Sequence, residues 1–471
     1  EISNKLLSFQ TAHVLQLYES LLHCNCVLDA SDTGTGKTYC TTALCRLLGL
    51  EPFIICPKSV INSWIDVCKS FNVSPFGIAN YEMIKGCKYF TANLEPVECP
   101  FFDKIKNDKL VNYKFQLPDN VIIIFDEAHR CKNIKTNTSK LLLSAYNTTN
   151  KIILLSATLA DKTELFKTFG LVFGFYHTQL GFATWLKKEL LKEKVVFNCL
   201  EKKGKPLSDE QKKLYVINKS LFPKCGSRMK IKELGDLFPK NQVIAQSYYL
   251  ADYNMVAQLH EEINTAMADL KNKETRAEAL GKIIRAKQRI ELLKAPIFCD
   301  LAQEALDNNY SVAIFVNYVE TMEHLCHLLG TACVIRGSQS LEERIANIKE
   351  FQDNNSKIII AIIQAGGVGI SLHDIHGDHP RMSLISPSWS GTDMVQALGT
   401  IHRAGSKTPA IQKIVFCAKT YEEKICEIIS SKFKILAAIN DGDMIGPNIP
   451  IEKVNEYNDA MEDTSYKYCK S

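Results

Sequence analysis

Residues 28–38 read Leu-Asp-Ala-Ser-Asp-Thr-Gly-Thr-Gly-Lys-Thr, a run whose residue types and spacing suit the binding of phosphate. Glycines let the backbone turn closely around an anion, and the N–H groups of the helix that follows point toward it. The run matches G-x-x-x-x-G-K-[ST] with Ser31 at the first glycine position. We expect Lys37 to neutralise phosphates and Thr38 to hold Mg²⁺. The predicted nucleotide-binding residues here are Asp32, Thr33, Gly34, Thr35, Gly36, Lys37 and Thr38.

A second pattern, Val-Ile-Ile-Ile-Phe-Asp-Glu-Ala-His at 121–129, complements this loop. Its apolar run predicts a central strand buried on both faces, and carboxylates after such a strand lie at the edge where open α/β sheets bind ligands. We expect Asp126 to hold Mg²⁺, Glu127 to orient and deprotonate an attacking water, and His129 to sense the phosphate. Loop and acidic pair together predict hydrolysis of ATP with Mg²⁺, whereas a loop that only caps a helix would leave the pair unexplained.

Two weaker signals flank these motifs. Gln10, upstream of the loop, is a candidate to pair with the hydrogen-bonding edge of adenine, although an exposed helix glutamine fits the spacing equally well. Ser156, Ala157 and Thr158 follow a predicted strand at 151–155. Hydroxyl groups at that position can link a nucleotide site to a second lobe through hydrogen bonds.

The elements that must position these residues alternate between strand and helix, which predicts an α/β fold with parallel sheets. The length of 471 residues predicts two to three domains. No apolar run reaches the roughly 18 residues of a membrane span. In the second half, 312–316, 332–335, 358–363, 383–386 and 411–417 are predicted strands, followed by a helix at 420–438. Segment 86–118 is predicted to be an irregular surface loop or insertion.

Cysteine and charge are distributed unevenly. The 17 cysteines include no C-x₂-C pair, which favours buried free thiols in a reducing compartment over disulfides or zinc. Net charge is only +4, but residues 187–240 hold 15 Lys and Arg against 7 Asp and Glu. This basic block is either a solvated surface or a surface that faces nucleic acid. Residues 253–295 predict a projecting helix pair with a second basic face.

The order of these motifs resembles the superfamily-two helicases and, within them, the Swi/Snf-type double-stranded DNA translocases. Residues 126–133, Asp-Glu-Ala-His-Arg-Cys-Lys-Asn, resemble that family's extended DEAH motif and carry the most specific part of the resemblance. The other stretches that resemble family motifs are 55–64, 80–84, 312–318, 335–344, 365–372, 387–390 and 396–403. Coverage is about residues 5–440.

The resemblance implies two tandem RecA-like lobes with a helical insertion between them. The implied domains are an ATP-binding lobe at 1–175, a basic and helical region at 176–296, a second lobe at 297–440 and a tail at 441–471. On the second lobe, Gln396 and Arg403 would complete catalysis, Gly369 would contact ATP, and His402 would couple the lobes. Implied nucleic-acid contacts are Lys58, Ser59, Trp64, Tyr81, Arg130, Lys132, Gly366, Gly367 and Trp389, although core packing is the alternative for each tryptophan.

Two departures from the family pattern matter. Ser156-Ala157-Thr158 has the form found in helicases, where Swi/Snf-type proteins commonly carry Gly-Thr-Pro. Thr400 stands where the pattern places an arginine, which leaves Arg403 as the one arginine finger unless a neighbour such as Arg381 compensates. We therefore expect a DNA-stimulated ATPase that translocates on duplex DNA. The alternatives are a strand-separating helicase and an ATP-binding scaffold that scarcely hydrolyses.

The expected partner is nucleic acid, with duplex DNA as the favoured track and RNA or single-stranded DNA as alternatives. We expect a monomer without membrane association. The composition fits an intracellular location in nucleus or cytoplasm, and a viral factory or virion is also compatible.

Overall fold

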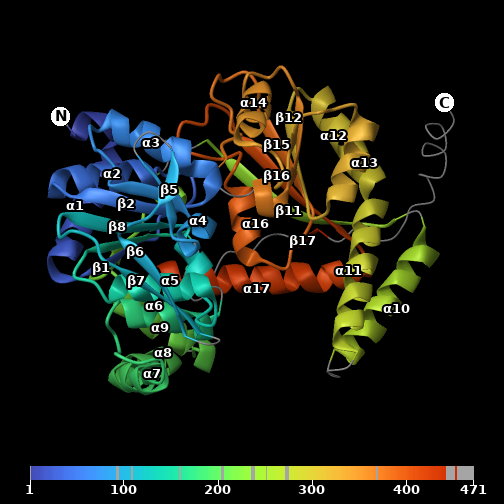
Figure 1. Cartoon of the computed structure of the whole chain (residues 1–471). Helices are drawn as coiled ribbons and strands as arrows, with labels where there is room; N and C mark the ends of the chain where they lie inside the picture. The colour runs from blue at the N-terminus through green and yellow to red at the C-terminus, as the bar shows by residue number, and fades with distance from the viewer. Residues whose placement is uncertain are drawn as a thin grey trace.

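The computed structural model describes residues 2–91, 95–107, 110–157, 159–160, 162–202, 206–234, 239–250, 252–270, 275–366, 370–441 and 451–452. These residues form two α/β lobes that lie side by side, each built on a mainly parallel sheet between helices (Figure 1). The predicted fold class of two tandem RecA-like lobes is confirmed. Thr158, Gly367, Gly369 and nearly all of the predicted tail at 441–471 lie outside the described residues.

The sheet of the first lobe has the strand order β10-β1-β9-β8-β2-β3-β4-β5. It is parallel from β10 to β3, and β4 and β5 add an antiparallel edge. The strands are β1 (Cys26–Asp29), β2 (Glu51–Cys56), β3 (Gly77–Asn80), β4 (Lys88–Phe90), β5 (Pro96–Glu98), β8 (Val121–Asp126), β9 (Ile152–Leu155) and β10 (Gly226–Ser227). As the apolar run predicts, every residue of β8 is buried.

Alternate side chains of these strands enter two different cores. Ile122 and Ile124 pack with α1 (Ser8–His23), α2 (Lys37–Leu48) and α3 (Ile61–Ser70) on one face. Ile123 and Phe125 pack on the other face, whose helices include α5 (Asn137–Tyr146), α6 (Lys167–Val172), α7 (Gly181–Lys192), α8 (Lys194–Lys202) and α9 (Asp209–Leu221). Burial on both sides fixes β8, and with it the acidic residues at its end.

The second sheet is parallel, with the order β13-β14-β12-β15-β16-β11-β17. Its strands are β11 (Asn241–Tyr248), β12 (Ser311–Val316), β13 (Val334–Ile335), β14 (Ile358–Ile362), β15 (Arg381–Ile385), β16 (Ala410–Cys417) and β17 (Ile451–Glu452). Helices α12 (Ala295–Asp307) and α13 (Val319–Leu329) cover one face. The other packs α14 (Leu341–Gln352), α16 (Gly391–Leu398) and α17 (Tyr421–Asp441). Each strand predicted in this half is present within two residues.

The region predicted as an insertion, 176–296, is divided between the lobes. Its helices α7 to α9 pack on the first lobe and β10 extends the first sheet, whereas β11 lies inside the second sheet. Helices α10 (Tyr253–Asp269) and α11 (Arg276–Leu293) form the predicted projecting pair, which hangs below the second lobe (Figure 1). The domain boundaries themselves remain a prediction, but this segment carries an edge strand of the first sheet, an inner strand of the second and the connection between them.

Segment 86–118 differs from the predicted irregular loop. It holds β4, β5 and a hairpin of β6 (Phe102–Asn107) and β7 (Leu110–Phe115). Phe102 and Tyr113 are buried and stack at a centroid distance of 5.2 Å, and Phe115 joins them. The expectation of an irregular loop was wrong because these aromatic residues alternate with polar ones and face the core of the first lobe.

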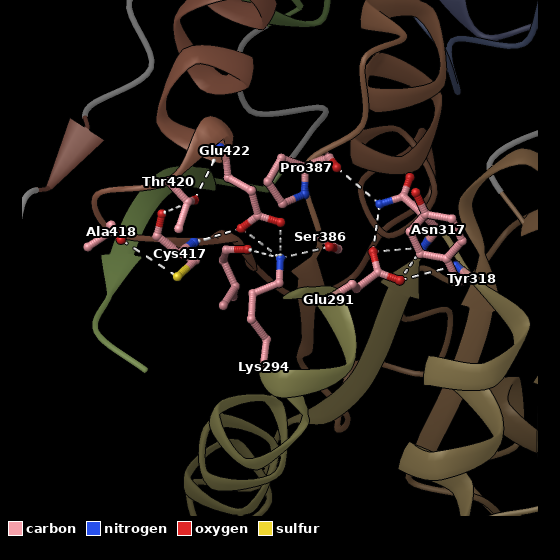
Figure 2. A network of polar contacts seen from close by, with 11 residues as sticks. Glu291, Lys294, Asn317, Tyr318, Ser386, Pro387, Cys417, Ala418, Thr420 and Glu422 are labelled. Atoms are coloured by element: carbon pink, nitrogen blue, oxygen red, sulfur yellow. Dashed lines mark hydrogen bonds and ion pairs between the residues drawn. The ribbon is translucent and has the colours of Figure 1, made fainter. Parts of the chain in front are cut away.

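A buried polar network fixes α11 to the second sheet (Figure 2). Lys294 is fully buried, and its Nζ donates to both carboxylate oxygens of Glu422, at 2.8 and 3.0 Å, and to Ser386 Oγ at 2.9 Å. One turn earlier, Glu291 accepts hydrogen bonds from the backbone N–H groups of Asn317 and Tyr318 at the start of α13. Separating these groups would leave a charge buried without a partner, which is costly inside a protein. The contacts therefore hold the C-terminal end of α11 rigidly against the second lobe.

Helix α17 crosses beneath the second sheet toward the first lobe, where it packs against α9 (Figure 1). Among the described residues, no helix combines the length and the apolar character needed to cross a bilayer.

Candidate active site

The phosphate-binding loop lies between β1 and α2 at the carboxyl edge of the first sheet. Gly34 and Gly36 have φ values of 88° and 93°, a left-handed conformation that other residues adopt at a cost. Lys37 Nζ donates to the carbonyl oxygens of Ser31 and Asp32, at 2.9 and 3.2 Å. The loop therefore curls around the lysine ammonium group, and α2 begins at that lysine with its N-terminus toward the loop.

Gln10 lies against this loop from α1. Its Oε1 accepts from Leu7 N at 2.8 Å, and its Nε2 donates to Thr35 O at 2.9 Å. A Cβ on Gly36 would lie 2.2 Å from Gln10 Nε2, so a side chain there has no room. Both polar atoms of the Gln10 amide are thus hydrogen-bonded to backbone groups of the first lobe. Pairing of Gln10 with adenine remains a prediction.

Asp126 is the last residue of β8 and is buried beneath the loop. Trp64 Nε1 donates to its Oδ2 and Glu127 N to its Oδ1, both at 2.9 Å. Burial first, and then the charge of Glu127, raise the pKa of Asp126 to about 7. A divalent cation beside this carboxylate would offset the desolvation, which is the property expected of a metal ligand.

Glu127 has the opposite environment. Its Oε2 lies 3.2 Å from His129 Nδ1, and the same ring nitrogen lies 3.3 Å from Ser156 Oγ. Burial favours the neutral acid, but the hydrogen bond and charge of His129, with the charge of Lys37, outweigh burial and lower the pKa of Glu127. The backbone of Glu127 has a φ of 54°, in the left-handed region that is strained for a residue with a side chain. Such strain is common at functional sites, where the surrounding structure holds it in place.

The second lobe meets the same loop through Arg403. Ala404 N donates to Gly34 O at 3.0 Å across the cleft. A Cβ on Gly34 would lie 2.6 Å from Arg403 Cγ, and a Cβ on Gly399 would lie 2.6 Å from Thr33 Cγ2, so neither glycine has room for a side chain. Burial lowers the pKa of Arg403 to about 10, while the charge of Glu127 opposes the shift. The structure therefore brings Arg403, the phosphate-binding loop and Glu127 to one place.

The remaining predicted residues of the second lobe lie around this contact. His402 is buried, and its Nε2 lies 2.8 Å from Pro239 O. Gln396 is buried in α16, and its Nε2 has no hydrogen-bond partner among the described residues. Thr400 is fully buried, and its hydroxyl donates to Ala397 O at 2.7 Å. Arg381 packs over the Phe351 ring at 4.5 Å and does not compensate for the missing arginine at the cleft.

The residues predicted to contact nucleic acid fall into two groups, those with exposed side chains and those with buried side chains. Lys58, Arg130 and Trp389 are exposed, and Ser59 and Lys132 are partly exposed. Gly366 ends α15 (Ile363–Gly366). Trp64 is fully buried on Asp126, and Tyr81 is buried with its hydroxyl donating to Asp126 O at 2.7 Å. For Trp64 the alternative of core packing therefore holds, and the prediction that Tyr81 contacts nucleic acid is wrong, because both side chains support the acidic motif from inside the lobe.

Comparisons with known proteins agree with this geometry. Residues 10–161 match the family "Type III restriction enzyme, res subunit", and residues 288–405 match "Helicase conserved C-terminal domain". The chain is 40% identical to the putative ATP-dependent RNA helicase L364 of Acanthamoeba polyphaga mimivirus, over 95% of this chain and 85% of that protein.

This chain belongs to the superfamily-two helicase ATPases.

The Swi/Snf resemblance is supported by a human relative, the SWI/SNF-related matrix-associated actin-dependent regulator of chromatin subfamily A member 1, which is 22% identical over 90% of this chain and 42% of that protein. The helicase is 24% identical to the ATP-dependent DNA helicase DDM1 of Arabidopsis thaliana over 86% of the chain, and it spans 58% of that protein. A solved Sulfolobus solfataricus SWI2/SNF2 ATPase core in complex with dsDNA aligns with 93% of this chain and 94% of its own, at 19% identity and a TM-score of 0.35.

The phosphate-binding loop of the helicase has a second support that no sequence pattern indicated. Residues 225–231, which we call the strap, run beside Leu28–Asp32 with backbone hydrogen bonds from Leu28, Ala30 and Asp32 to the strap at 2.9 Å each. Arg228 Nη2 lies 2.7 Å from Asp32 Oδ1, and Ile231 N donates to Asp32 Oδ2 at 2.9 Å. Arg228 sits in the basic block about 200 residues away, and no spacing signal pointed to it.

A buried contact between a histidine and an aspartate beside the loop was also not predicted from the sequence. His13 Nε2 of α1 lies 3.1 Å from Asp29 Oδ2, and its Nδ1 lies 2.9 Å from Ser227 Oγ of the strap. Burial would raise the pKa of Asp29, but the charge and hydrogen bond of His13 outweigh it and lower that pKa. The one available signal was a charged residue inside an otherwise apolar strand.

We predict that Arg228→Ala raises the KM for ATP by about three- to tenfold, since a charge-assisted hydrogen bond of this kind contributes on the order of 1 kcal/mol where solvent partly reaches it. The substitution removes one of the partners of Asp32 in the loop and leaves Glu127 untouched, so kcat should change less than KM. Steady-state kinetics on Arg228→Ala and on Lys230→Ala, whose partner Glu233 lies in its own turn, would check this. Equal KM values in the two variants would refute the support role.

Proposed function

We propose that this helicase-family ATPase is a motor that translocates on duplex DNA, driven by Mg²⁺-dependent ATP hydrolysis. The observation that carries the proposal is the seating of the Arg403 loop on Gly34, opposite Glu127. A nucleotide held by the first lobe would be contacted by both lobes. Its hydrolysis would then change how the lobes sit against each other, and the change in lobe contact is what moves a motor along its track.

Each residue of the cleft has a chemical part in this proposal. Backbone N–H groups at the start of α2 and the Lys37 ammonium would bind the phosphates. Thr38 and Asp126 are the residues that would hold Mg²⁺, which neutralises phosphate charge. Ionised Glu127 would accept the proton of the attacking water, and Arg403 would offset the negative charge that develops on the phosphate. The buried Asp126 carboxylate fits such a metal, because its own surroundings supply little positive charge.

The link between hydrolysis and movement would run through buried hydrogen bonds. Glu127 contacts His129, and His129 contacts Ser156 at the carboxyl end of β9. A change of charge at Glu127 therefore reaches the next strand without passing through solvent. The exposed Lys58 and Arg130 lie at the ends of neighbouring strands, where cations can contact phosphates regardless of sequence.

Duplex DNA is favoured by the extended motif at 126–133, whose arginine and lysine side chains reach the surface beside the acidic pair. The relative named a DNA helicase supports the same choice. A second candidate function, strand separation on RNA or DNA, is favoured by Ser156 in place of the glycine of Swi/Snf-type proteins and by the viral relative named a putative RNA helicase.

A nucleic-acid panel distinguishes these functions. We predict that duplex DNA stimulates ATP turnover by about tenfold, equivalent to about 1.4 kcal/mol of barrier, and more than single-stranded DNA or RNA does. A parallel strand-displacement assay should show no unwinding. Displacement with the strongest stimulation by a single strand or RNA would favour the second function. A turnover rate that is the same with all three nucleic acids would contradict both motors and support a scaffold.

A further inference from the structure

Two cysteines far apart in the sequence meet at the start of the strap. Cys24 ends α1, and Cys225 directly precedes β10. Their Sγ atoms lie 3.2 Å apart, and Cys24 Sγ also lies 3.6 Å from Lys224 O. Cys225 is buried, whereas Cys24 is partly exposed. Neither thiol has a part in the nucleotide chemistry proposed above.

We propose that Cys24 and Cys225 are a reversible dithiol–disulfide site that reacts with small disulfides of the glutathione class. A disulfide has an S–S length of about 2.05 Å, so the two sulfur atoms need to approach by only about 1.2 Å. This inference is independent of the proposed function, because it rests on the position of the two thiols alone.

Exposure decides the order of the reaction. Burial raises the pKa of Cys225 to about 12, so its thiolate is scarce and Cys24 reacts first. Cys24 loses a proton, and its thiolate attacks one sulfur of the small disulfide, which forms a mixed disulfide and releases one small thiolate. Cys225 then loses its proton and attacks Cys24 Sγ, releasing the second small thiolate. Two protein thiols are oxidised to one disulfide, and one small disulfide is reduced to two thiols.

The cross-link would join the start of the strap to α1, next to the nucleotide site. From Cys225 onward the strap pairs with β1 and then with the phosphate-binding loop, where Cys225 O accepts from Leu28 N at 2.9 Å. The disulfide would fix the start of that ladder to α1 across a separation of 201 residues. Because a cross-link over a long segment restricts the unfolded chain strongly, the expected result is a more stable first lobe. Because the sulfur atoms already touch, the active geometry should be kept.

The test exposes the purified full chain to oxidised glutathione and maps disulfide-linked peptides by mass spectrometry. We expect a peptide pair joining Cys24 to Cys225 with a mass about 2 Da below the sum of the reduced peptides. The unfolding midpoint should rise by several degrees, dithiothreitol should reverse the rise, and kcat for ATP should stay within about twofold. The buried neighbour Cys26 is the competing partner, and a Cys24–Cys26 or Cys26–Cys225 link in its place would overturn the assignment.

Matched serine variants complete the design. Cys24→Ser and Cys225→Ser should each lose both the linked peptides and the reversible rise of the midpoint. Cys199→Ser, which removes an exposed thiol of the described region, should keep both. Absence of the 24–225 link in the unsubstituted chain, or an unchanged rise of the midpoint in Cys225→Ser, would refute the proposal without bearing on ATP hydrolysis.

Discussion

Glu127→Gln is expected to lower ATP turnover by about 10²- to 10⁴-fold, the range that a positioned general base contributes. Glutamine keeps the size of the side chain and its hydrogen-bonding capacity toward His129, but it cannot accept a proton at neutral pH. The ionised state of Glu127 is secured by His129 at 3.2 Å, so the substitution removes a base that is ready to act.

Binding of ATP should survive the same substitution, because the phosphate contacts come from the loop and Lys37. We expect the dissociation constant for a fluorescent ATP analogue to stay within about threefold, equivalent to at most about 0.7 kcal/mol. Glu19→Gln, an exposed carboxylate on α1, is the matched control and should keep full turnover. Turnover above one tenth of the original rate in Glu127→Gln would show that another group takes the proton.

Arg403→Ala is expected to reduce kcat by about 10²- to 10³-fold, the loss seen when a donor to developing negative charge is removed. Residue 400 is a buried threonine, and Arg381 is buried against the Phe351 ring, so neither supplies a second arginine to this cleft among the described residues. The loss should therefore be near the upper end of that range. Arg403 Nε donates to Gly399 O at 2.8 Å, which holds the guanidinium group in place before the nucleotide binds.

Lysine should not rescue this position, since an ammonium lacks the planar set of donors that both holds Gly399 and faces phosphate. Lys407→Ala removes an exposed cation four residues away and serves as the control. Single-turnover hydrolysis with excess enzyme measures the chemical step directly. A rate within threefold of the unsubstituted enzyme in Arg403→Ala would mean that the second lobe does not take part in hydrolysis.

Sequence patterns predicted the strands and helices of both lobes well where a buried strand leads directly into a functional motif. The apolar run before Asp126 requires a central strand, and the glycines of the loop require a tight turn, so local rules were sufficient there. They failed at 86–118, where alternating aromatic residues bury one face of a hairpin, and at Tyr81, whose motif position suggested a surface that burial rules out.

By itself the sequence determined the α/β alternation, the phosphate-binding loop, the acidic pair and the family to which they belong, because each depends on residues that are neighbours along the chain. Only the tertiary structure decided that Arg403 meets Gly34, that Arg228 holds Asp32, and that Cys24 touches Cys225. These pairs are about 200 to 370 residues apart, and their contact depends on how strands order themselves within a sheet and how the lobes close. No local spacing encodes that order, since it results from the packing of whole layers.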